Sequence, residues 1–127
     1  MYTIKKAAHI VDELKIEDGD KTMTVDVNIY VDDVMADVVK CQKKIALAQA
    51  KIRENKNDGD ALAGLGEAVI ALFGLLFGEE QTKAIVEFYE NRTASMLADF
   101  LPYIAQVIIP EIQKAQKNLA ATYTSWK

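Results

Sequence analysis

The sequence is poor in the side chains that most often carry chemistry. It contains one cysteine, Cys41, and one histidine, His9, among 127 residues. A lone cysteine excludes an intramolecular disulfide and a zinc site built on several thiolates. A lone histidine leaves a single side chain to serve as the base of a Ser-His-Asp or Cys-His arrangement. We expect His9 to lie in an N-terminal lead-in away from any nucleophile and Cys41 to pack on an apolar helix face, so no catalytic residue and no enzyme activity are predicted.

Positive charge is also scarce. The chain has 15 Lys and Arg against 19 Asp and Glu, a formal net charge of -4. An acidic protein gains no general attraction to phosphate backbones or anionic headgroups. Nucleic acid and lipid surfaces are therefore not expected partners.

The chain begins without the apolar stretch that a secretory signal requires, because Asp12 and Glu13 come too early after the N-terminal residues Met1 to His9. Together with the lone cysteine, this favours a reducing cytoplasm. The longest apolar run, Ala61 to Phe77, would span about 26 Å as a helix, short of the roughly 30 Å hydrocarbon core, and it contains Glu67. We expect a buried helix there and no membrane span.

Motifs for cofactors and metals are missing. The pair Gly64 and Gly66 resembles the start of a dinucleotide fingerprint, but Val69 stands where the third glycine belongs. In the Asp-Gly-Asp segment at 58–60, the closing glutamate of a calcium loop is replaced by Leu65, and the similar segment at 18–20 fits less well. Both segments are interpreted as turns, and no cofactor and no metal are predicted.

Half of the residues are hydrophobic, which is typical of a globular chain, and the length fits one domain over 1–127. Alternating apolar and polar residues on either side of Asp18-Gly19 predict a β-hairpin over 10–30, because Asp-Gly readily adopts the positive φ of a tight turn. A lone hairpin is marginal in water, so its apolar face must cover helices or pair with another sheet edge, such as that of a second copy.

After the hairpin the apolar spacing changes to three and four, the pattern of an amphipathic helix. The first helix, over 31–55, carries an apolar stripe and can be capped by Asp32 or Asp33. Three further helices are expected over 60–77, 79–91 and 93–120, the second ended by Gly78 and the last kinked near Pro102 and Pro110. The fold class is therefore mainly α, with an N-terminal β-hairpin followed by a bundle of about four helices.

The helix over 60–77 is apolar almost all round, so it has to be covered on several sides. It is either the centre of the bundle or part of an interface between copies. Large apolar patches on soluble proteins often mark interaction sites. The residues predicted to bind a protein partner come from the hairpin face and from the aromatic and aliphatic surplus around this helix: Met23, Val25, Val27, Ile70, Phe73, Phe77, Phe88 and Tyr89.

The order of these parts resembles the tail assembly chaperones of long-tailed bacteriophages. The resemblance lies in a short hairpin ending at Ile29, helices that include the apolar segment Ala61 to Phe77, and an acidic chain of this length. The lead-in from Met1 to Lys21 and the strand Thr22 to Val27 are also similar to small proteins of Gram-positive phage tail-gene clusters. The resemblance covers most of the chain but rests on layout and assigns no individual residue.

Membership of that family would imply a protein without enzymatic activity that binds the tape-measure protein, keeps its apolar helical segments soluble in the host cytoplasm, and self-associates. We expect this chain to self-associate through the hairpin edge and the second helix. The alternative is a structural tail or virion component, or a generic helical adaptor. A third reading is a small lytic protein whose segment Ala61 to Phe77 inserts into a membrane.

Overall fold

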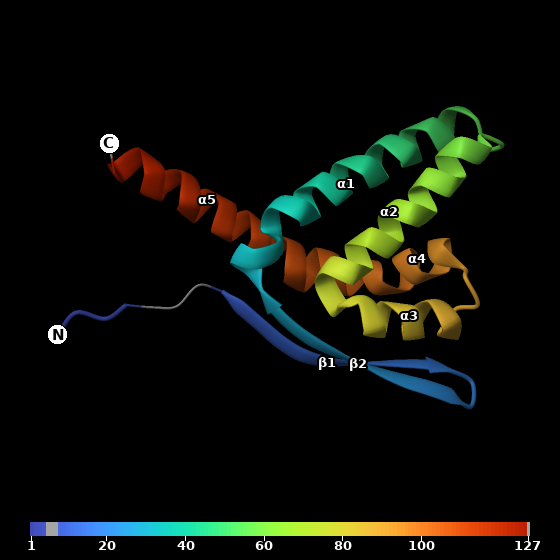
Figure 1. Cartoon of the computed structure of the whole chain (residues 1–127), viewed down its shortest axis with the longest axis horizontal. Coiled ribbons are helices and arrows are strands. Elements are labelled where there is room, and N and C mark those ends of the chain that lie inside the picture. The colour runs from blue at the N-terminus through green and yellow to red at the C-terminus, as the bar shows by residue number, and fades with distance from the viewer. Residues whose placement is uncertain (5–7, 127) are drawn as a thin grey trace.

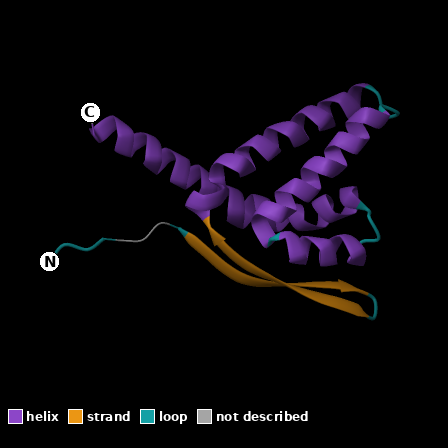
Figure 2. Cartoon of the chain, in the orientation of Figure 1, coloured by secondary structure: helices purple, strands orange, loops and turns teal. Residues whose placement is uncertain are grey.

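The computed structural model describes residues 1–4 and 8–126 (Figure 1). Part of the N-terminal stretch considered above, Lys5 to Ala7, lies outside the described residues, as does Lys127. Two antiparallel strands lie along one side of a set of helices (Figure 2). The predicted class, mainly helical with an N-terminal β-hairpin followed by helices, is confirmed.

The hairpin consists of β1, His9–Asp18, and β2, Lys21–Tyr30, paired in register from His9 opposite Tyr30 to Asp18 opposite Lys21. The two loop residues are Gly19 and Asp20, and Gly19 has φ +59°. A positive φ at the first central position is the pattern of a type II′ turn, which suits the twist of the strands. The glycine therefore supplies the turn, as expected, but within the pair Gly19-Asp20 and not within Asp18-Gly19.

His9 is not in an unstructured lead-in, as its neighbours suggested, but is the first residue of β1. Its ring stacks on Tyr30 with centroids 3.9 Å apart, and its Nε2 is hydrogen-bonded to the Asn28 side chain. This pairing could not be predicted from local sequence, because the partners of His9 lie on the opposite strand.

The inner face of β2 packs on α2 and contributes Val25, Val27 and Ile29 to the core, all of them buried. Docking on helices therefore covers the apolar face that a lone hairpin would leave in water.

α1, Val31–Glu54, follows β2 without a loop. Neither Asp32 nor Asp33 caps it, because the N-cap residue is Tyr30 and makes no side-chain cap bond. Both acids lie in the first turn, where their charge favours the helix dipole. α2, Gly59–Phe77, is capped by Asp58, whose carboxylate accepts a hydrogen bond of 3.1 Å from the Ala61 amide.

Gly78 is the C-cap residue of α2, and α3, Glu79–Phe88, begins directly after it. The predicted end of α3 at 91 was three residues too late, because Glu90 and Asn91 adopt positive φ and turn the chain toward α4. Gly78 has φ 84° and ψ 162°, a region that is essentially restricted to glycine. This residue sets the angle between α2 and α3.

Replacing Gly78 by alanine is expected to lower the free energy of unfolding by about 1–3 kcal/mol, because a β-carbon strains this backbone conformation. Gly74→Ala is the matched control, since Gly74 is helical and nothing lies within 4 Å of an added β-carbon. The control should be neutral or slightly stabilising. Urea denaturation of the two variants measures the difference, and equal midpoints would contradict the assigned role of Gly78.

The last predicted helix is one helical run over 93–126, longer than the expected 93–120 (Figure 1). It consists of α4, Thr93–Tyr103, a π-helical segment η1, Ile104–Ile108, and α5, Ile109–Trp126. The Ile109 amide bonds to the Ile104 carbonyl, five residues back. Pro110 has no amide hydrogen and its ring crowds the carbonyl four residues earlier, so a locally wider helix accommodates it. The expected disturbance near the prolines is therefore a π segment.

The core lies where the C-terminal half of α2 meets α4, η1, the middle of α1 and β2. Phe73, Phe77 and Phe100 form its aromatic centre, with ring centroids 4.9 to 5.5 Å apart. The N-terminal half of α2 and the C-terminal half of α1 extend away from this core as a two-helix arm (Figure 1). The C-terminal half of α5 extends in another direction.

Candidate functional site

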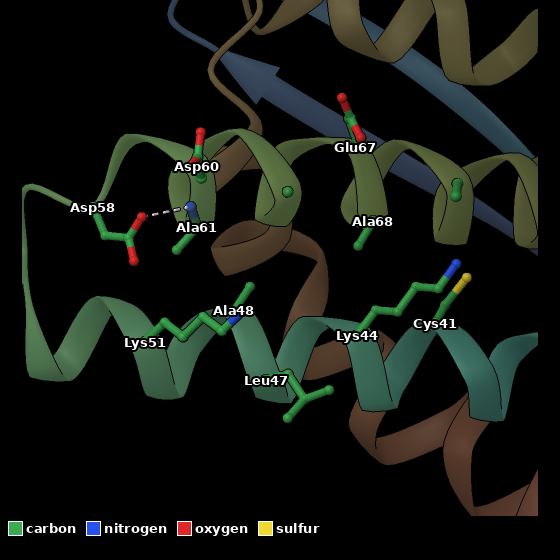
Figure 3. A pocket seen from close by; sticks show the side chains of 12 residues that line it. Cys41, Lys44, Leu47, Ala48, Lys51, Asp58, Asp60, Ala61, Glu67 and Ala68 are labelled. Atoms are coloured by element: carbon green, nitrogen blue, oxygen red, sulfur yellow. Dashed lines mark hydrogen bonds between the residues drawn. The ribbon is translucent and has the colours of Figure 1, made fainter.

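A groove runs along the two-helix arm between α1 and α2 (Figure 3). Its volume is about 780 Å³. Ala48, Ala61 and Ala68 point into the space between the helices. Small residues make up most of its floor: Ala48, Ala61, Gly64, Ala68 and Ala71. Ala48, Ala61 and Ala68 are buried, so these small side chains let α1 and α2 approach each other closely.

The two walls of the groove carry opposite charge. α1 contributes Lys44 and Lys51, whereas Asp60 and Glu67 come from α2. Within the described residues the ion pairs are Lys15–Glu17 and Arg92–Glu90, so these wall charges do not pair with one another. Leu47 lies beside the lysines with 65% of its surface exposed. We refer to this feature as the groove.

A second concave surface lies where β1 meets the turn between α3 and α4. Two adjoining hollows of about 280 and 230 Å³ share Ile16, Glu17, Tyr89 and Asp99. The remaining apolar lining comes from Leu14, Phe88, Phe100 and Tyr103. We refer to this feature as the aromatic cleft.

Two tyrosine hydroxyls tie the aromatic cleft together. Tyr89 donates a hydrogen bond of 2.8 Å to Asp99, and Tyr103 donates one of 3.1 Å to Asp12. Burial, followed by these bonds to carboxylates, raises the pKa of Tyr103 to about 12 and raises that of Tyr89 as well. The hydroxyls therefore stay protonated at neutral pH and hold β1 and α3 against the C-terminal helix.

The eight predicted partner residues divide into core and surface. Val25, Val27, Phe73 and Phe77 are buried within the single chain, so they stabilise the fold and offer no contact surface. Ile70 is 41% exposed on α2. Met23, Phe88 and Tyr89 are half-buried, and Met23 lies directly opposite Ile16 in the hairpin. Phe88 and Tyr89 line the aromatic cleft, Met23 is paired with the cleft residue Ile16, and Ile70 is not part of the lining.

The groove residues Lys44, Lys51, Asp60 and Glu67 were missed from the sequence. The signal that could have identified them is a matched spacing of seven residues between the two bases on α1 and between the two acids on α2. It becomes meaningful only when the two helices are known to lie side by side.

On each outer edge of the hairpin, backbone groups in the middle of the strand are hydrogen-bonded to side chains. Gln81 of α3 accepts a hydrogen bond from the Asp26 amide and donates one to the Asp26 carbonyl, each 2.8 Å long. On β1, the Glu13 amide donates to the Asp12 carboxylate at 2.8 Å. Filling edge donors and acceptors with side chains is a way of preventing strand addition. The hairpin edge is thus a poorer route to self-association than its sequence suggested.

Reactive groups are few within the described residues. No cluster of three or more His, Cys, Asp or Glu side chains that could hold a metal is found there. Cys41 lies in α1 with 8% of its surface exposed, and burial raises the pKa of its thiol.

Cys41 is therefore expected to react with iodoacetamide at pH 8 at least about tenfold more slowly in the folded protein than in urea, because the thiolate is the reactive form. The rate should rise as the pH increases, since a raised pKa shifts ionisation to higher pH. Mass spectrometry of the alkylated chain measures both rates. Equal rates in the folded and unfolded protein would show that the thiol is accessible.

Two helices are long and apolar enough to cross a membrane by length and composition, α2 and the run Thr93–Thr124. They pack against each other through Phe73 and Phe100 in the same core. A core helix of a soluble protein has the same composition, so this finding is weak support for insertion.

Comparisons with known protein families, with curated proteins and with solved structures find no match.

Proposed function

We propose that this chain is an assembly chaperone that binds apolar helical segments of a client protein, in the manner of the tail assembly chaperones of long-tailed bacteriophages. The client would be of tape-measure type, and the site of action would be the cytoplasm of a bacterial host. Binding requires accessible apolar surface on a soluble body and no reactive group.

The observation that carries the proposal is the amount of exposed surface. The chain exposes 9194 Å², whereas a compact monomer of 14.1 kDa is expected to expose about 6,700 Å². Fewer than half of the residues of α2 are buried, although it is the most apolar helix. α2 leaves Leu62 and Ile70 exposed, and exposed apolar surface commonly marks contact with another protein.

The aromatic cleft is the surface proposed to take the client. Its half-buried Phe88 and Tyr89 offer large apolar area that is already held in place, which lowers the entropy lost on binding. The rim carries Glu17, Asp18 and Asp99 together with Lys15 and Arg92, so its charge is mixed. A client segment with large apolar side chains is the complement of such a site.

Coexpression with a tape-measure fragment tests this function. The wild-type chain should keep the fragment in the soluble fraction, and Phe88→Ser should reduce the soluble share several-fold, because it removes an aromatic wall of the cleft. Val11→Ser is the matched control, since Val11 is an exposed apolar residue of β1 that lines neither the aromatic cleft nor the groove. A fragment that stays insoluble with the wild-type chain would contradict the proposal.

The alternative of a structural virion component leads to a different result. A chaperone leaves before the particle is complete, whereas a structural component remains. Mass spectrometry of finished particles should therefore not detect the chain, and its presence at a fixed copy number would favour the structural role. Sedimentation with liposomes would favour the membrane reading.

A further inference from the structure

The two walls of the groove carry charges of opposite sign, so each wall is complementary to the other wall and not to a copy of itself. The α1 wall is basic through Lys44 and Lys51, and the α2 wall is acidic through Asp60 and Glu67. An occupant must therefore present acid to α1 and base to α2. The same pair of helices, rotated by a two-fold axis that runs along the groove, presents that pattern.

The spacing of the charges matches as well. Lys44 and Lys51 are seven residues apart, as are Asp60 and Glu67, which is about 10.5 Å along a helix in each case. α1 and α2 of one chain run antiparallel to each other. A two-fold rotation about an axis along the groove keeps the direction of each helix, so α1 of one copy lies antiparallel on α2 of the other. In this arrangement Lys44 of one copy lies near Glu67 of the other, and Lys51 lies near Asp60.

The small residues explain how the lysines fit. Gly64 and Ala71 lie on the α2 side of the groove, and nothing lies within 4 Å of a β-carbon built at Gly64. The aliphatic stem of a lysine from a second copy can cover this surface while its ammonium group reaches the acids at the edge. Leu47, 65% exposed, would be covered in the same contact.

From these features we infer that the groove is an interface with a second copy of this chain, which pairs two α1–α2 arms into a four-helix bundle. The chain as a whole exposes about 2,500 Å² more than a compact monomer of its mass, and a standard interface covers about 800 Å² per partner, so pairing of the arms would account for part of this excess. A two-fold interface requires a self-complementary surface, which the groove provides. The inference goes beyond client binding, which is proposed for a different surface.

Charge reversal tests the pairing directly. One variant carries Lys44→Glu and Lys51→Glu, and the other carries Asp60→Lys and Glu67→Lys. Each variant alone opposes like charges across the interface, so its dimer should dissociate at least about tenfold more readily than the wild type. An equimolar mixture restores both pairs on both sides of the bundle and should form a heterodimer.

Light-scattering mass after gel filtration measures each state, and circular dichroism checks that the variants are folded. All four positions are exposed, so the fold should tolerate the changes. The control is Lys114→Glu with Lys117→Glu, the same change in charge on α5, which should leave the dimer intact. Variants that remain dimeric alone, or a mixture of folded variants that stays monomeric, would overturn the inference. Client solubility is measured separately with Phe88→Ser, so failure of one proposal does not imply failure of the other.

Discussion

Replacing Phe73 by alanine should lower the free energy of unfolding by about 3–5 kcal/mol, a large share of the 5–15 kcal/mol that usually holds a domain together. Phe73 is fully buried and packs against both Phe77 and Phe100. Its removal leaves a cavity where α2, α4 and the hairpin meet. Urea denaturation followed by circular dichroism measures the loss.

Ile70→Ala is the matched control on the same helix. Ile70 is 41% exposed, so this change should cost about 0.5 kcal/mol or less. The pair of variants distinguishes a core residue from a surface residue three positions away. Similar costs for both would mean that α2 is covered on its outer side or is not packed as described.

Replacing Val27 by a charged residue should lower the free energy of unfolding by a comparable amount. Val27 is 1% exposed on the face of β2 that meets α2, and Val27→Asp would bury a carboxylate without a partner. We expect a loss of about 4 kcal/mol or more at pH 7, because the carboxylate must be desolvated or the hairpin must leave the helices. The loss should decrease at low pH, where the acid is neutral.

Thr24→Asp provides the control for Val27→Asp, because Thr24 is exposed on the same strand. It should change the unfolding free energy by about 0.5 kcal/mol or less. Hydrogen exchange of β1 and β2 gives a second readout, since an undocked hairpin loses protection of its ladder amides. Unchanged protection in Val27→Asp would contradict the docking of the hairpin on α2.

Elements with strong local signals were predicted well from the sequence. The alternation around Gly19 and the stop at Gly78 each depend on residues within a few positions, so the hairpin and the end of α2 followed from them. The π segment and the extension of the last helix to Trp126 were not predicted. The π segment depends on how the chain around Pro110 accommodates a missing amide, for which helical periodicity gives no sign.

Which apolar residues lie at the surface was predicted less well, for a physical reason. Periodicity shows which residues share a face, but it does not show what covers that face. Val27 and Phe73 looked like available apolar surface, yet the chain itself buries them. Glu67 was noted only as a charge within an apolar run, and only the antiparallel packing of α2 on α1 reveals the opposite-charge walls of the groove.

The two proposed surfaces are compatible with one protein. The groove lies on the two-helix arm, and the aromatic cleft lies where β1 meets the turn between α3 and α4. Pairing of the arms would leave the aromatic clefts of both copies available, so a dimer would present two client sites. Two linked sites hold a repetitive helical client more tightly than one, because the second contact is intramolecular.

Light scattering of the wild-type chain over a range of concentrations tests most directly whether this fold leaves helix surface for another protein to cover. The expected mass is twice the 14.1 kDa of one chain, falling toward one chain only on dilution. A mass of 14.1 kDa that persists to millimolar concentration would contradict it.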